Sequence, residues 1–319
     1  MRLLKLVPDN TNIDFMRVRK IAFVLSVLAT LVAIALVPIR GLNLGVDFVG
    51  GQMIRATFNQ PAPIEDVRSL IAGLDVGDAS IQEFGNPNTL SIRMGLPEGG
   101  EEAANQVGSQ IRNAIAEAYP GTEFAIDTVS GKVSNELYRD GAMAVGFAML
   151  GIAIYIWFRF EWQFGVAALI TLAHDVAMTM GFFALTQLEF NLNVVAAILT
   201  IVGYSLNDTV VIFDRIRENL RKYRKMEIIP LLNLSLNETL SRTIVTSISI
   251  LLALGVLVLI GPEVIFGLSI AIFVGIFVGT YSSIYISAPI LVLFNVGPET
   301  FVPRPTPGGE QPAVPREGV

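Results

Sequence analysis

The sequence contains no cysteine, a single histidine and few charged residues. Without cysteine no disulfide framework can form, and one histidine, His174, cannot build a multi-histidine metal site, so we expect no bound metal. Only 16% of the 319 residues are charged, against about a quarter in a typical soluble domain, whereas 52% are hydrophobic. The mean hydropathy is +0.59. This composition predicts a membrane protein.

The motifs of several common enzymes are also missing. The sequence has no P-loop of the form G-x-x-x-x-G-K-[ST], so it does not bind ATP in that way. It has no H-E-x-x-H or G-x-S-x-G, which excludes the common metalloprotease and serine hydrolase sites. We therefore expect no enzymatic activity and no cofactor, and any energy that the protein uses must come from a partner or from ions.

Six long apolar runs are present instead. Each is long enough, at about 1.5 Å per residue, to cross a hydrocarbon core of about 30 Å. They cover residues 21–39, 141–160, 164–185, 192–213, 240–260 and 264–288. The first contains Ala33-Ile34-Ala35, which resembles a signal-peptide cleavage site, but the tripeptide lies inside the apolar run, so we interpret the run as an uncleaved anchor.

The distribution of charge orients these spans. Residues 1–20 hold five basic and two acidic residues, and residues 214–228 hold six basic ones. By the positive-inside rule both segments lie in the cytoplasm, together with the C-terminus. Residues 40–136 then lie outside, and 41–135 carry twelve acidic and five basic residues. The tail, 296–319, is rich in proline and glycine, and we expect it to be disordered.

The predicted outer region alternates strands and helices. GGQMIRATF, ASIQEFG, NTLSIRM and EFAIDTVS have the pattern of strands, and PIEDVRSLIAGL and EEAANQVGSQIRNAIAEAY that of helices. The order βαββαβ predicts a ferredoxin-like α+β domain, with Asn86-Pro87-Asn88 as the turn between the second and third strands. A five-helix membrane domain would follow over 137–295. Because the acidic residues are scattered, we expect the α+β domain to bind or to act as a lever, not to catalyse.

Two polar residues, Asn207 and Asp208, interrupt the fourth predicted span. A carboxylate within hydrocarbon costs roughly 2.5–3.5 kcal/mol, so intramembrane acids are candidates for function. On a helix, Asp208 shares a stripe with Ala197, Ile201 and Tyr204, which can face neighbouring helices. The alternative is that Asp208 is only a polar contact between packed helices.

Arg242 in the fifth predicted span is the candidate partner of Asp208. The two spans are antiparallel, and Asp208 and Arg242 lie roughly 8 Å and 12 Å to the cytoplasmic side of their span centres. An ion pair is therefore geometrically allowed. The alternative is that Arg242 extends its side chain to the membrane interface, as long basic side chains do near helix ends.

His174 and Asp175 lie near the centre of the third predicted span. Neighbours on a helix point about 100° apart, so we expect that the two do not face one partner. One of them would contact the fourth span, and the other would meet a water or a hydroxyl. His174 is either part of a proton relay or a histidine satisfied in the core.

Small residues recur every four positions in the last predicted span: Gly267, Ala271, Gly275, Gly279 and Ser283. Such a ridge permits close helix packing. On sequence alone it is either a seam inside the bundle or a face that meets another membrane subunit.

Six ordered segments together resemble one family. They are VDFVGG, FRFEWQFG, AHDV, GYSLNDTVVIFDRIREN, ETLSRTIVTS and GTYSSIYISAP, between residues 46 and 289. In this combination they resemble the SecF proteins of the bacterial protein-export machinery over nearly the whole chain. The resemblance implies half of a resistance-nodulation-division (RND) transporter fold, and it assigns the family's membrane acid to Asp208 and its arginine to Arg242.

The resemblance also implies partners and a location. SecF proteins lie in the bacterial cytoplasmic (inner) membrane, among lipid, and pair with SecD. The pair associates with the SecYEG channel, with YajC and YidC as further candidate partners, and nucleic acid is not among them. The SecD–SecF pair uses protons as the coupling ion to help draw preproteins outward after the ATP-driven step of SecA. Because this sequence has no SecD-like half, we expect SecD to be supplied in trans.

These inferences combine into one hypothesis with two rivals. Protonation of Asp208 would break its pair with Arg242, which stays charged, and the helices would move. Asp47, Gly50 and Gly51 would pass the motion to the outer domain if they form a hinge, although a fixed turn is the simpler interpretation. The rivals are a half-transporter that exports lipids or small molecules, and a non-transporting assembly factor that clamps a channel.

Overall fold

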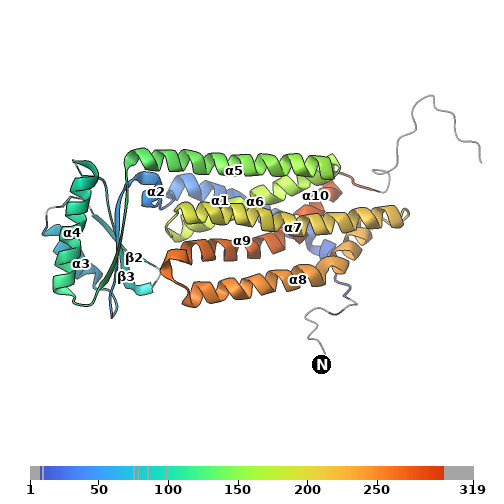
Figure 1. Ribbon diagram of the computed structural model, residues 1–319. Coiled ribbons are helices and arrows are strands. Elements are labelled where there is room, and N and C mark those ends of the chain that lie inside the picture. The colour runs from blue at the N-terminus through green and yellow to red at the C-terminus, as the bar shows by residue number, and fades with distance from the viewer. Residues whose placement is uncertain are drawn as a thin grey trace, which may run out of the picture.

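The computed structural model describes residues 8, 11–74, 76–77, 79–84, 86–97 and 99–297, without the side chains of Glu101 and Glu263. Long helices run side by side in a bundle, and an α+β domain covers one end of it (Figure 1). We call that end of the bundle the domain end and the opposite end the far end. The segment predicted to be disordered lies outside the described residues, apart from 296–297.

The bundle contains the six predicted spans. In the described part of the chain, six helical segments are long and apolar enough to cross a membrane. They consist of η1 (Phe15–Val18) with α1 (Arg19–Arg40), α5 (Gly131–Arg159), α6 (Trp162–Thr186), α7 (Leu192–Lys222), α8 (Ile228–Ile260), and α9 (Phe266–Tyr285) with α10 (Ser287–Leu293). The chain is therefore a multi-pass membrane protein, as the sequence predicts.

Several helices differ from the predicted spans. α5 begins at Gly131, α7 continues to Lys222 and α8 begins at Ile228, because helical hydrogen bonding continues through charged segments that hydropathy excludes from a span. The last span breaks at Ile286, between α9 and α10. Pro289 has no backbone N–H to donate to the preceding turn, which explains a break at this point.

The α+β domain has the predicted βαββαβ order. It comprises β1 (Gly51–Thr57), α3 (Ile64–Ala72), β2 (Ala79–Phe84), β3 (Asn86–Met94), α4 (Gly100–Ala118) and β4 (Glu123–Val129). The strands form an antiparallel sheet in the order β2-β3-β1-β4, which is ferredoxin-like. Helices α3 and α4 cover the sheet face that points away from the bundle (Figure 1). Asn86-Pro87-Asn88 begins strand β3, so the hairpin is tighter than predicted.

A short helix and two glycines connect α1 to the sheet. Helix α2 (Val46–Val49) is followed by Gly50 and Gly51, whose φ angles of 75° and 118° lie in the region that favours glycine. A Cβ on Gly51 would lie 2.3 Å from the carbonyl oxygen of Met94 on β3. The segment is therefore a tight turn that requires glycine.

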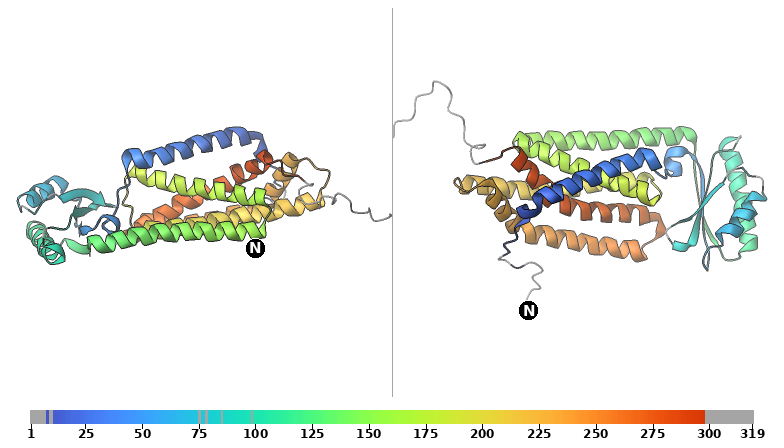
Figure 2. Two further views of the ribbon diagram at one scale, coloured as in Figure 1. Left: turned by 90° about the horizontal axis from the view of Figure 1, so that it is seen from above. Right: turned by 180° about the vertical axis from the view of Figure 1, so that it is seen from behind.

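Helix α9 lies inside the bundle, where it packs against α6, α7 and α8. Helices α1 and α5 lie on opposite sides of the bundle (Figure 2), α1 against α6 and α5 against α7. Two apolar clusters fill the interior. The domain-end cluster includes Phe183, Phe190, Val194, Ala197, Ile198 and Ala271. The far-end cluster includes Phe160, Phe164, Ile212, Phe213, Ile216 and Leu220.

The variant Gly51→Ala tests the turn. The added methyl combines an unfavourable φ with a close approach to Met94, so we expect the free energy of local unfolding of the sheet to fall by roughly 1–3 kcal/mol. Amide hydrogen exchange of β1 and β3, measured by mass spectrometry on the full chain in detergent, reports this loss. Gly146→Ala is the control, because its Cβ would meet no atom within 4 Å. Equal exchange in both variants would show that the turn tolerates a side chain.

Candidate functional site

The carboxylate of Asp175, on α6, connects three helices inside the bundle. Its Oδ2 accepts hydrogen bonds from the hydroxyls of Ser205 on α7 (2.5 Å) and Ser282 on α9 (2.9 Å). Its Oδ1 lies 2.8 Å from Nδ1 of His174. Asp175 is 1% exposed. Because both carboxylate oxygens have partners, the bundle can retain this group at membrane depth.

His174 and Asp175 are arranged differently from the prediction. The sequence predicts that they face different partners, whereas their side chains bond to each other. The angle of about 100° separates the directions in which the side chains leave the helix, but an imidazole ring can still reach sideways to its neighbour. Asp175 makes the predicted contact with the fourth span, through Ser205. His174 lies towards α1, where it lines an apolar groove with Phe23 and Val27.

The glycines of α9 allow the helices to approach closely. A Cβ on Gly275 would lie 2.3 Å from Cδ1 of Ile201 on α7, and one on Gly279 would lie 3.3 Å from Cβ of Ser205. Gly267 also packs against α7. The small-residue ridge therefore faces a neighbouring helix of the same chain, which decides between the two alternatives left by the sequence.

Asp208 is buried one turn further along α7 than Ser205, but its surroundings differ from those of Asp175. Asp208 is 4% exposed. Its Oδ2 has no hydrogen-bond partner in the described part of the chain, and the same holds for the hydroxyls of Tyr204 and Thr209 beside it. The fold thus leaves this carboxyl group unsatisfied, a state that points to protonation or bound water.

The ion pair predicted between Asp208 and Arg242 is not formed in this structure. No hydrogen bond or ion pair joins the two side chains, both of which are described, and Arg242 is exposed on α8. Thr243, the residue after Arg242 on α8, is buried in the bundle instead. Because adjacent residues point about 100° apart, a buried Thr243 leaves Arg242 to one side of it, exposed but close enough to act electrostatically on Asp208.

Asn207 lies on the surface of the bundle and is not part of the Asp175 cluster. It belongs to an exposed stripe on α7 with a spacing of three and four residues, made of Asn193, Ala196, Thr200, Gly203 and Asn207. This spacing places the five residues on one helix face. Small and polar side chains on such a face favour contact with another membrane helix over contact with lipid.

Apolar side chains separate the buried carboxyl groups of Asp175 and Asp208 from both ends of the bundle. The domain-end cluster contributes Ala197 and Ile198, which precede Ser205 on α7, and the far-end cluster contributes Ile212 and Phe213, which follow Asp208. The described residues hold no group of three His, Cys, Asp or Glu side chains that could bind a metal. The chemistry that buried carboxyl groups offer is the binding and release of a proton, and with apolar layers on both sides a proton would need helix movement to reach them.

Sequence reasoning missed Ser282 and the central place of Asp175. Ser282 is adjacent to Ser283, which belongs to the predicted ridge, and it lies three residues after Gly279. A hydroxyl beside a tightly packed ridge needs a partner on another helix, so this position carried a usable signal. The connection through Asp175 could not be predicted, because it depends on how three helices are rotated about their axes.

Comparison with known proteins gives two family matches. Residues 110–296 match the family described as protein export membrane protein SecD/SecF, C-terminal. Residues 35–62 match the SecD/SecF GG motif, and this range contains Asp47, Gly50 and Gly51.

Individual relatives agree with these matches. The chain is 45% identical to the protein translocase subunit SecF of Rickettsia rickettsii and 44% identical to that of Rickettsia conorii, over 91% of this chain and 94% of each relative. Among solved structures, SecDF from Thermus thermophilus, described as a translocon-associated membrane protein, is 34% identical with a TM-score of 0.83. A structure of SecDF in a super-membrane-facing form has a TM-score of 0.66 at the same identity. In both cases the match covers 90% of this chain but only 39% of the SecDF chain.

The fold and the polar cluster define a multi-pass membrane protein that carries an α+β domain between its first two spans and buried carboxyl groups among its helices. Within that class, the chain belongs to the SecD/SecF family of protein export membrane proteins. The relatives that it matches over nearly their whole length are SecF subunits of protein translocases.

Removing the hydroxyls that bind Asp175 tests the cluster. We expect Ser205→Ala and Ser282→Ala each to lower the free energy of unfolding by about 1–2 kcal/mol, measured by denaturation with sodium dodecyl sulfate. The double variant should deviate from the sum of the two losses, because both hydroxyls share one acceptor. Ser249→Ala is the control, since that hydroxyl bonds only to the carbonyl of Val245 on its own helix. Equal losses in all three single variants would contradict a specific cluster.

Proposed function

We propose that this chain is the SecF subunit of a bacterial protein-export machinery and couples proton movement to export. It would pair with SecD in the cytoplasmic membrane and assist preproteins through SecYEG after the ATP-driven step of SecA. The observation that carries this proposal is the contrast between two buried acids. Asp175 is bonded through both oxygens, whereas Asp208 holds an oxygen without a partner.

Asp208 is the residue that we propose to bind and release the coupling proton. A charged, unpaired carboxylate is costly at membrane depth, so each change of protonation changes which helix arrangement is favoured. Moving one charge across about 100 mV supplies about 2.3 kcal/mol, enough to shift a two-state equilibrium substantially. In this proposal the structure is the state in which Arg242 lies near Asp208 without an ion pair. The ion pair predicted from sequence would form in the other state.

Helix α7 offers a direct route from Asp208 to the α+β domain. The same helix carries Asp208 and Ser205, and its first backbone N–H, that of Leu192, donates to Oδ2 of Asp47 on α2 (2.9 Å). A carboxylate at a helix N-terminus is also favoured by the helix dipole. The turn at Gly50 and Gly51 follows directly, so a shift of α7 would be passed to strand β1.

The orientation follows from charge. Helix α7 ends in Arg221 and Lys222 at the far end, away from the α+β domain. We propose that the far end faces the cytoplasm and the α+β domain the periplasm. Protons driven inward would then enter from the domain end and leave towards the basic end.

The exposed stripe of α7 supports a partner within the membrane. Its polar and small residues lie next to Asp208 along the helix, and we propose that SecD packs there and completes the surroundings of the proton site. The chain covers 39% of a SecDF chain and 94% of the SecF relatives.

The variant Asp208→Asn tests the proton site. It keeps size and hydrogen bonding while it removes titration, so we expect proton-gradient stimulation of export to fall to background in membranes that contain SecD, SecYEG and SecA. Glu218→Gln, an exposed position on the same helix, should retain full stimulation. Copurification with SecD should be unchanged in both. Full stimulation in Asp208→Asn would refute the proposal, and loss of SecD binding would favour a role for Asp208 in assembly.

The variant Gly203→Leu tests the membrane partner surface. Gly203 is exposed and a Cβ there meets no atom within 4 Å, so the isolated chain should keep its stability. A bulky side chain on the stripe should strongly reduce copurification with SecD in mild detergent. Gly146→Leu, at an equally open position on α5, should not reduce it. Equal copurification of both variants would place the partner elsewhere.

A further inference from the structure

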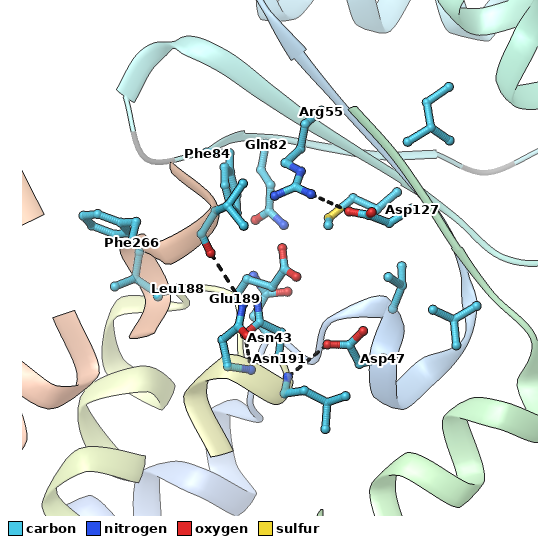
Figure 3. Close-up of a pocket in the computed structure, with 18 of the residues that line it drawn as sticks. Asn43, Asp47, Arg55, Gln82, Phe84, Asp127, Leu188, Glu189, Asn191 and Phe266 are labelled. Carbon is cyan, nitrogen blue, oxygen red and sulfur yellow. Dashed lines mark hydrogen bonds and ion pairs between the residues drawn. The ribbon is translucent and has the colours of Figure 1, made fainter. Parts of the chain in front are cut away.

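A cavity of about 550 Å³ lies where the α+β domain meets the domain end of the bundle. Figure 3 shows its walls, formed by the open face of the sheet on one side and by the loop between α6 and α7, with the start of α9, on the other. Side chains of Arg55, Gln82 and Asp127 come from the sheet, and those of Glu189 and Asn191 from the loop. The cavity is thus polar and lies at the ends of the membrane-spanning helices.

Glu189 is the unusual residue of this cavity. It is 8% exposed although it lies in a connecting loop. Its Oε1 lies directly over Gly45, where a Cβ would be only 2.7 Å away. Its Oε2 is buried and has no hydrogen-bond partner among the described residues. A carboxyl group that is nine-tenths buried with one oxygen unsatisfied is uncommon, and it points to a group that holds a proton.

Charged groups near Glu189 come from the four strands and from α2, with Glu83 of β2 exposed on the cavity wall, but the two basic groups are engaged elsewhere. Arg55 on β1 pairs with Asp127 on β4. Arg93 on β3 donates to the carbonyl oxygen of Leu44 and to the side chain of Asn43. Asp47 on α2 accepts from the N–H of Leu192.

These surroundings together raise the pKa of Glu189. Burial raises the pKa of Glu189 above its usual range, and the negative charge of Asp47 adds to this. Arg93, a hydrogen bond with Asn191, and Arg55 oppose the increase in the pKa without cancelling it.

Glu189 also lies among the contacts that join the two parts of the molecule. The segment after α1 and the loop that carries Glu189 exchange backbone hydrogen bonds, from Gly45 N–H to the oxygen of Phe190 and from Phe190 N–H to the oxygen of Asn43, both 2.8 Å. Arg93 of the sheet holds the same segment. A change that brings water to the buried Oε2 of Glu189 therefore disturbs the contact between sheet and bundle.

We propose that Glu189 is an external proton-binding site whose protonation holds the α+β domain against the bundle. The neutral form suits the closed junction, in which Oε2 is buried without a partner, whereas the charged form favours an opened junction in which water reaches that oxygen. Because the pKa of Glu189 is higher in the closed junction than in water, closure is most stable at acidic pH and weakens as the pH rises through that pKa. This inference goes beyond the proposed function, since it requires neither SecD nor Asp208.

The absence of cysteine makes the proposal directly measurable. Two cysteines, at the exposed positions Ala116 on α4 and Leu185 on α6, can carry spin labels that report the distance between domain and bundle. In the full chain in lipid, electron double resonance should give one narrow distance distribution at low pH. The distribution should become broader with increasing pH, with a midpoint above about 4.3, the ordinary value for Glu.

Two variants identify the group. Glu189→Gln mimics the neutral form, so its distribution should stay narrow at every pH. Glu65→Gln removes an exposed carboxylate on α3, outside the cavity lining, and should keep the response of the unmodified sequence. A distribution that does not change with pH in the unmodified sequence would overturn the proposal. So would a pH response in Glu189→Gln equal to that in Glu65→Gln. Asp208→Asn should retain the pH response. A failure of the Glu189 proposal can therefore be distinguished from a failure of the proposed function, which depends on Asp208.

Discussion

The bundle depends on one hydrogen-bonded carboxylate. Asp175 accepts from Ser205 and Ser282 and bonds to His174, so α6, α7 and α9 are fixed to each other at one buried point. No water is available at membrane depth to replace these partners, which gives the contact a specificity that apolar packing lacks. The glycine ridge of α9 then follows as a requirement, because the hydroxyls reach the carboxylate only if the helices approach closely.

The two buried acids in the membrane helices, Asp175 and Asp208, differ in the hydrogen bonding of their carboxyl oxygens, and therefore in the role that suits them. Asp175 has partners for both oxygens and fits a structural connection. Asp208, three residues from Ser205 on α7, has an oxygen without a partner, and a group of this kind can change its protonation when its surroundings change. Apolar clusters lie on both sides of the site, so in the proposed function proton exchange requires helix movement. Helix α7 joins this site to the α+β domain through Asp47.

Much of the fold could be predicted because hydropathy and periodicity are local properties. The six spans and the βαββαβ order needed only runs of apolar residues and their spacing. Contacts between helices were harder, because they depend on rotation about the helix axis. Depth along the membrane correctly brings Arg242 within electrostatic reach of Asp208, but with Thr243 buried the exposed Arg242 makes no ion pair. Glu189 could not be recognised at all, since a loop acid has no sequence signal until a sheet from elsewhere in the chain covers it.

The division of roles between Asp175 and Asp208 can be measured by infrared difference spectroscopy on the chain in lipid bilayers, between about pH 5 and about pH 8. The carbonyl stretch of a protonated carboxyl group reports which acid exchanges its proton, and Glu189→Gln removes the contribution from the domain junction. In that background we expect a pH-dependent band that Asp208→Asn abolishes and Asp175→Asn preserves. A band that persists in Asp208→Asn and disappears in Asp175→Asn would contradict the assignment of the exchanging proton to Asp208.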